Sequence, residues 1–128
     1  MKVKEIMYRK LYIIDAGETV LEAAKVMKSA NIGSLLVKEG TKVVAIVTDK
    51  DLVWKALAND KNPEAIKVRE IMSSPMIMID GEEELGAAVD MFVENHIRRV
   101  VVSLNGKIAG IVSTQLIAQH LKAALAVV

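Results

Sequence analysis

The spacing of apolar residues changes in a fixed order along the first half of the chain. Four apolar residues at positions 11–14 are followed by an Asp-Ala-Gly turn, which predicts a short strand. Thr19 then suits the N-cap of a helix that extends to about Asn31, because apolar residues recur there at helical spacing. Two further apolar runs flank a polar turn and predict a β-hairpin, and a second helix follows Thr48. The hairpin strands lie at residues 35–37 and 43–47, around the turn at residues 39–42.

The second half of the chain repeats this order of elements. It predicts a strand near residues 76–79, a helix near residues 83–95, a second hairpin, and a last helix that begins at Thr114. The strands of this hairpin are residues 99–104 and 107–112, joined by a turn at Asn105 and Gly106. Both hairpins are rich in β-branched residues, as is typical of strands covered by helices. The predicted fold class is therefore α/β (α+β), with two pseudo-symmetric β-α-β-β-α units packed through their sheets.

A shift of 65 residues aligns the two halves without a gap. Val3–Met7 then falls on Val68–Met72, and the 61 aligned pairs contain 14 identities. The polar segment at residues 59–63 ends in proline and separates the two copies. A unit of about 60 residues buries little surface alone, so we expect the copies to form one body. The two repeats are assigned to residues 1–62 and 63–128.

Composition narrows the classes of function. Hydrophobic residues make up 52% of the 128, with only one Phe, one Trp and two Tyr, so we expect an aliphatic core. A net charge of +1 provides no overall field for nucleic acid or an anionic membrane. The lack of cysteine excludes thiolate nucleophiles and cysteine-based metal sites. With no signal-like leader and no apolar stretch of about 18 residues, we expect a soluble, cytoplasmic protein without membrane association.

The two units also carry short motifs in register. Each opens with Ile-Met, and the last strand of each hairpin ends in Ile-Val-Thr or Ile-Val-Ser. In this pattern the chain resembles, over almost its whole length, a pair of CBS (cystathionine β-synthase) domains, or Bateman module. The resemblance implies an adenosine-containing ligand, such as AMP, ADP, ATP or S-adenosylmethionine, bound in a cleft between the repeats. It also implies that occupancy is reported to a partner protein and that the module is not an enzyme.

Thr48 and Asp51 match the hydroxyl-x-x-Asp motif of the family. A hydroxyl and a helix N-terminus can both donate to a phosphate or ribose oxygen, and a carboxylate one turn later can accept both hydrogens of a diol. The resemblance thus assigns the ribose to Asp51 and the sugar-phosphate to Thr48. A capping box has the same spacing and stabilises a helix without any ligand. Thr48 can both cap the helix and contact a ligand. In the second repeat Ser113 keeps the hydroxyl but Leu116 replaces the acid, so we expect no diol contact there.

The two repeats also differ at the start of the middle strand. The second repeat has Arg98 and Arg99 where the first has Gly33 and Ser34. In nucleotide-sensing relatives, such as the regulatory subunit of AMP-activated protein kinase, a basic pair at this place faces phosphates, and guanidinium groups fit phosphate oxygens well. At most one of the two arginines can point directly into a cleft if both lie in a regular strand. The alternative for each is a solvated arginine at the strand end.

Small residues in the first repeat leave room for a flat base. Gly33 and Ser34 would let the backbone approach a purine, with Ile32 and the strand around Tyr12 as apolar walls. The alternative for Gly33 is a tight turn between helix and strand. The predicted nucleotide site therefore comprises Tyr12, Ile32, Gly33, Ser34, Thr48, Asp51, Arg98 and Arg99.

We therefore predict a regulatory module that forms a homodimer, binds an adenine nucleotide as its regulatory ligand, and signals to an unidentified target protein. It would need no cofactor or metal, although Mg²⁺ could accompany ATP. The alternative is a structural or dimerisation module with a vestigial ligand site. Trp54, on the helix after the Asp51 motif, is either a dimer contact or an ordinary half-buried aromatic residue. A hydrolase or transferase is disfavoured because the sequence offers no nucleophile–base pair and no P-loop motif. Nucleic-acid binding is disfavoured by the near-neutral charge.

Overall fold

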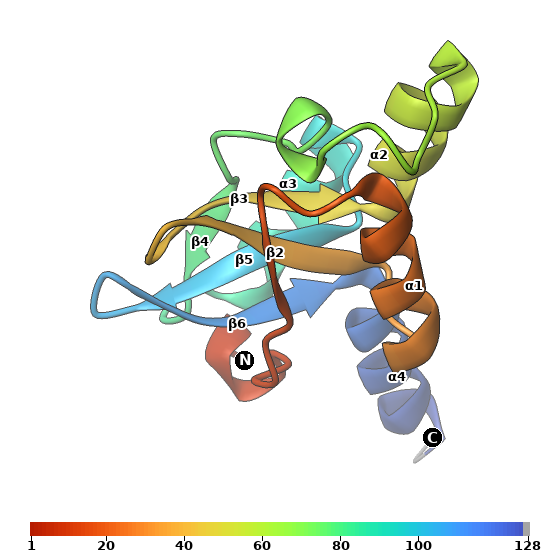
Figure 1. Cartoon of the computed structure of the whole chain (residues 1–128). Helices are drawn as coiled ribbons and strands as arrows, with labels where there is room; N and C mark the ends of the chain where they lie inside the picture. The colour runs from red at the N-terminus through yellow and green to blue at the C-terminus, as the bar shows by residue number, and fades with distance from the viewer. Residues whose placement is uncertain (127–128) are drawn as a thin grey trace. The chain divides into compact units, whose positions relative to one another are not determined.

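The computed structural model describes residues 1–126, in which the first repeat forms a three-stranded sheet with helices (Figure 1). The strand order is β1-β2-β3, with β1 parallel to β2 and β2 antiparallel to β3. The elements are β1 Ile13–Asp15, α1 Val20–Ala30, β2 Ser34–Glu39 and β3 Lys42–Thr48. The predicted N-cap is confirmed, because the side chain of Thr19 accepts the N–H of Glu22 at 3.1 Å.

The second repeat forms an equivalent sheet of order β4-β5-β6 with the same pairing directions. Its elements are β4 Met78–Asp80, α3 Leu85–Asn95, β5 Arg99–Leu104, β6 Lys107–Ser113 and α4 Thr114–Leu125. Asn105 and Gly106 adopt positive φ values of 53° and 75°, as a two-residue hairpin turn of primed type requires. The predicted mixed class and the β-α-β-β-α order are therefore confirmed. Both first strands begin about two residues later than expected, because only the later residues pair with the hairpin.

The helical segment after Thr48 is less regular than predicted. It begins as a short α-helix, α2, widens into a π-helical turn, η2, and ends in a 3-10 turn, η3. The bounds are α2 Asp49–Asp51, η2 Leu52–Ala56 and η3 Leu57–Asn59. Apolar spacing predicts that such a segment is helical, but it does not predict that a π-helical turn interrupts the α-helix.

The compact units of the structure differ from the two sequence repeats. One unit contains residues 12–76, and the other contains residues 1–11 with residues 77–128. The short 3-10 helix η1 (Val3–Glu5) packs with the second repeat, and η4 (Val68–Glu70) packs with the first. Each repeat is thus completed by the segment that precedes the other one. The division at residues 62 and 63 describes the sequence repeats and stays a prediction.

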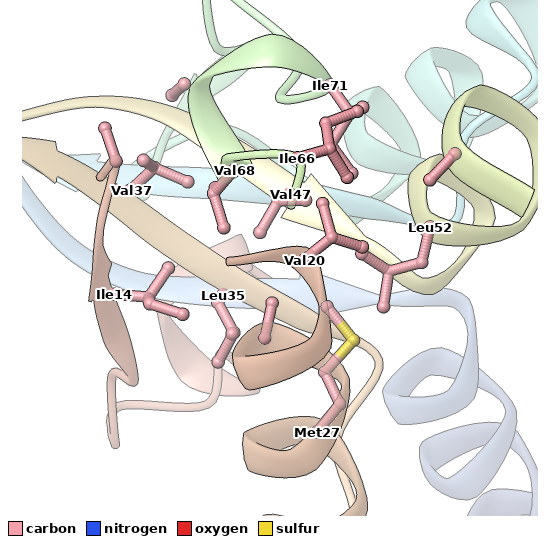
Figure 2. Close-up of a cluster of buried hydrophobic side chains, with 14 residues drawn as sticks. Ile14, Val20, Met27, Leu35, Val37, Val47, Leu52, Ile66, Val68 and Ile71 are labelled. Carbon is pink, nitrogen blue, oxygen red and sulfur yellow. The ribbon is translucent and has the colours of Figure 1, made fainter. Parts of the chain in front are cut away.

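The core of the unit at residues 12–76 is aliphatic, as its composition predicts. Side chains from α1, the sheet and the segment around η4 point toward one another in Figure 2. Val20, Ala23 and Met27 of α1 are buried, which matches the predicted apolar face of that helix. Val68 and Ile71 enter the same cluster. The unit that contains the second repeat has a separate cluster, to which Val3 and Met7 contribute.

None of the helices formed by residues 1–126 combines the length and the apolar character needed to cross a lipid bilayer.

Candidate functional site

The junction of β3 and α2 carries the predicted Thr48–Asp51 motif. Thr48 is the N-cap of α2, and its side chain accepts the backbone N–H of Asp51 at 3.2 Å. The carboxylate of Asp51 accepts the backbone N–H of Thr48 at 2.9 Å in return. This is a capping box with Asp in place of the usual Glu or Gln. The structural alternative for this motif is therefore present in the folded chain.

The carboxylate of Asp51 has further partners. Nζ of Lys55, one turn along the helical segment, lies 2.9 Å from Oδ1. The hydroxyl of Ser73 lies 3.2 Å from Oδ1 and 3.3 Å from Oδ2. The side chain of Asp51 is only 7% exposed, so its negative charge is held by the Lys55 cation and by hydrogen bonds.

Lys55 and Ser73 are themselves held in place. Nζ of Lys55 also donates to the carbonyl oxygen of Ile71 at 3.2 Å and contacts the hydroxyl of Ser73 at 3.3 Å. The backbone of Ser73 pairs with Ile46 of β3 in both directions, at 2.8 and 3.2 Å. The segment after η4 thereby brings its serine to the end of β3, where the acid lies.

The predicted small residues lie beside this motif. Gly33 accepts the backbone N–H of Asp49 through its carbonyl oxygen at 2.9 Å, so the turn before β2 is hydrogen-bonded to the start of α2. Ser34 is buried and lies opposite Thr48 in the β2–β3 register. The structure therefore brings Gly33, Ser34, Thr48 and Asp51 together within one unit.

The predicted apolar walls have a second role in the structure. Tyr12 and Ile32 both pack, partly buried, against the aliphatic core of the unit at residues 12–76. The carbonyl oxygen of Tyr12 accepts the N–H of Leu36 at 2.9 Å. Their contact with a purine stays a prediction.

The predicted phosphate ligands belong to the other compact unit. Arg98 is exposed and lies before β5, and its carbonyl oxygen accepts the N–H of Thr114 at 3.0 Å. Arg99 is half-buried and is the first residue of β5, opposite Ser113. Because Arg98 lies outside the regular strand, strand alternation does not force the two side chains to opposite faces. That either arginine shares a ligand with Asp51 stays a prediction.

The equivalent junction in the second repeat keeps only the helix cap. The hydroxyl of Ser113 accepts the N–H of Leu116 at 3.1 Å, so the predicted cap is confirmed. Leu116 supplies no carboxylate. At the 65-residue offset, Tyr8 and His120 take the positions of Ser73 and Lys55, and Tyr8 pairs with Ile111 just as Ser73 pairs with Ile46. The backbone arrangement is thus shared, but among the described residues the polar cluster of Asp51, Lys55 and Ser73 has no carboxylate counterpart at the junction of β6 and α4.

Two residues of this cluster were not predicted from the sequence. Lys55 had a weak signal, since it lies four residues after Asp51 on a predicted helix. Ser73 had none, because its contact with Asp51 spans 22 positions. His96 is the C-cap of α3 and has a left-handed backbone conformation, with a φ of 52°. Within residues 1–126, no group of three or more His, Asp or Glu side chains is arranged to hold a metal ion.

Comparison with known proteins identifies the family. The family model described as CBS domain matches twice, at residues 3–57 and 68–123. An uncharacterized protein of Methanopyrus kandleri is 37% identical over 93% of this chain, which spans 62% of that relative's length. A CBS-domain protein from Burkholderia ambifaria has a structure similar to this one with a TM-score of 0.91, at 25% identity and with 96% and 95% of the two chains covered. A hexameric CBS-CP12 protein from bloom-forming cyanobacteria matches with a TM-score of 0.83 at 29% identity, covering 92% and 69%. The chain therefore belongs to the CBS-domain family and contains two tandem CBS repeats.

Proposed function

We propose that this CBS pair is a regulatory module that binds an adenine nucleotide, or a related adenosyl ligand, and signals its occupancy to a partner protein. The observation that carries the proposal is the carboxylate of Asp51, held at the start of α2 beside the hydroxyl of Thr48. A carboxylate accepts the hydrogens of a ribose diol, and the N-terminus of a helix favours the negative charge of a phosphate. The counterpart of Asp51 in the second repeat is an apolar leucine, so helix capping alone does not require the acid.

Signalling would follow from differential affinity. A ligand shifts an equilibrium between two states of the module only by the difference between its binding free energies for those states. A ligand that contacts Asp51 in one of these states and not in the other would give such a difference. Regulation in this form requires no catalytic residue.

Self-association is part of the proposal. The helical segment after Thr48 exposes three apolar side chains, of which Trp54 is 63% exposed. The other two are Val53 and Leu57, at helical spacing from each other. Exposed apolar residues grouped on one helical segment suit a protein interface, and the structurally similar CBS-CP12 protein is hexameric. Sedimentation velocity of the wild type and of Trp54→Ala tests this part: a dimer that dissociates in the variant supports it, and a monomeric wild type contradicts it.

The ligand is tested by calorimetric titration with AMP, ADP, S-adenosylmethionine, and ATP with and without Mg²⁺. Saturable binding of at least one ligand is expected, together with a large loss of affinity in Asp51→Asn. Asp49→Asn is the matched control, because it removes the same charge from the same turn of α2 and leaves the carboxylate of Asp51 in place. Absence of binding by every ligand at millimolar concentration would contradict the proposal.

The second candidate is a structural module with a vestigial site. It is favoured by the intrachain contacts of Asp51, which give the acid a role without a ligand. Unchanged self-association and partner capture after substitution of both Asp51 and Arg99, in a chain that binds no nucleotide, would favour it.

A further inference from the structure

The carboxylate of Asp51 is already engaged before any ligand arrives. Oδ2 accepts the N–H of Thr48 at 2.9 Å, and Oδ1 lies 2.9 Å from Nζ of Lys55. Ser73 lies within reach of both oxygens, at 3.2 and 3.3 Å, although its hydroxyl has a single hydrogen to donate. That hydrogen can satisfy only one of the two oxygens at a time.

A vicinal diol would need two acceptor positions on this carboxylate. The two oxygens offer about four lone-pair positions in all. Three groups of the described chain already use some of them, and the side chain of Asp51 is only 7% exposed. A diol that binds Asp51 with both hydroxyls must therefore displace one of the groups now in contact with the carboxylate.

The three groups differ in how readily they can be displaced. The N–H of Thr48 is part of the backbone that opens α2. Lys55 supplies a compensating positive charge, and its departure would leave a buried carboxylate without that cation. Ser73 is neutral and makes the longest of these contacts.

Ser73 can also move without disturbing its own segment. Its backbone is fixed to Ile46 by two hydrogen bonds, so rotation about one side-chain torsion is enough to turn the hydroxyl away. The residue is only partly buried, and water can therefore satisfy the hydroxyl once it has turned.

We propose that the hydroxyl of Ser73 is an internal competitor, which the vicinal diol of a bound nucleotide displaces from Asp51 while Lys55 stays paired. The proposal rests on the function proposed above and adds a residue that sets its affinity. Removal of the competitor should tighten the binding of a ligand that carries the diol and leave a ligand without the diol unaffected. A purely structural serine would instead affect both ligands equally or weaken both.

The test is calorimetric titration of the wild type and Ser73→Ala with AMP and with 2′,3′-dideoxy-AMP. Ser73→Ala should bind AMP about three- to tenfold more tightly, the range expected for one net hydrogen bond, and bind the dideoxy nucleotide as the wild type does. Ser74→Ala is the matched control, because its hydroxyl contacts the carbonyl oxygen of Val44 rather than Asp51, and it should change neither affinity. Ser73→Thr keeps a hydroxyl and should bind AMP like the wild type, and a thermal melt without ligand verifies that each variant is folded.

The outcomes separate this inference from the proposed function. If the wild type binds AMP but Ser73→Ala binds it equally or more weakly, the competitor is ruled out and the proposed function stands. An equal gain for both nucleotides also rules it out, because the effect would not pass through the diol. If the wild type binds no AMP, the proposal that the chain binds AMP is wrong, and so is the proposal that Ser73 competes with the AMP diol for Asp51.

Discussion

Thr48 and Asp51 each accept the backbone N–H of the other, at 3.2 and 2.9 Å, so the start of α2 is closed by a reciprocal pair of hydrogen bonds. Ser113 and Leu116 keep one half of this pair in the second repeat. The first junction therefore combines helix capping with a buried negative charge, whereas the second junction is a cap alone.

This difference predicts how two matched cap variants behave. Thr48→Ala and Ser113→Ala each remove a side-chain acceptor from a helix N-terminus, and each should lower the free energy of unfolding by about 1 kcal/mol. Only Thr48→Ala should also weaken nucleotide binding. Chemical denaturation and calorimetric titration of both variants test this, and an equal loss of affinity in the two would contradict the assignment of the site to the first repeat.

Lys55 should stabilise the chain by compensating Asp51. Lys55→Met leaves the carboxylate without its cation and should lower the free energy of unfolding by about 2 kcal/mol, less than for a fully buried pair because the lysine side chain is 47% exposed. The double variant Asp51→Leu/Lys55→Met, which removes the charge as well, should be more stable than Lys55→Met. Urea denaturation of the set measures this, and additive losses would show that the pair is not coupled.

The 3-10 helices η1 and η4 each precede one repeat in the sequence and pack with the other. This packing predicts which sheet is affected when an equivalent residue of each helix is substituted. Val3 and Val68 occupy the same repeat position, and both are fully buried, in different clusters. Each substitution by Ala should cost about 2 kcal/mol from lost burial and the cavity left behind. Hydrogen exchange should show Val3→Ala weakening protection in β5 and β6, and Val68→Ala weakening it in β2 and β3. If Val3→Ala weakened protection in β2 and β3 instead, and Val68→Ala weakened it in β5 and β6, the packing of η1 with the second repeat and of η4 with the first would be contradicted.

Glu82 predicts an acid-sensitive attachment of the N-terminus. Hydrogen bonds from Lys2 and Lys4, each 2.6 Å long, lower the pKa of Glu82 to about 2, and the Glu82 hydrogen bond raises the pKa of Lys2. A carboxyl with a lowered pKa stabilises the fold above its unfolded pKa, and that contribution is lost as the pH falls from about 4.5 toward 2.

Thermal melts of the wild type and Glu82→Gln across this range test the attachment. The difference between their melting temperatures should be largest above pH 4.5 and should shrink as the pH approaches 2. High salt should also reduce the difference, because these groups are exposed. A difference that is constant with pH would show that the ion pairs do not hold the segment.

Local features of the fold could be predicted because their causes are local. The cap at Thr19 and the turn at Asn105 and Gly106 depend on residues within a few positions of each other. The exchanged packing could not be predicted, because apolar spacing shows that Val3 and Val68 are suited to burial without showing which sheet receives them.

The candidate site likewise contains residues that could be predicted from the sequence and residues that could not. Thr48 and Asp51 could be predicted from a three-residue spacing and from the resemblance to CBS domains. Ser73 reaches Asp51 only because its segment pairs with Ile46, a contact between positions far apart in the sequence. Side chains contributed by a distant segment leave no periodic signal, so the partners of the acid become visible only in the folded chain.

The central claim is that Asp51 binds the sugar diol of a nucleotide, and a four-way calorimetric comparison tests it most directly. AMP and 2′,3′-dideoxy-AMP are each titrated into the wild type and into Asp51→Asn. If the contact exists, removing either the carboxylate of Asp51 or the diol of the nucleotide should weaken binding by about tenfold or more. Removing both should weaken binding little more than removing one, because the two groups interact with each other. Equal affinity of the wild type for the two nucleotides, or independent additive losses, would contradict the account.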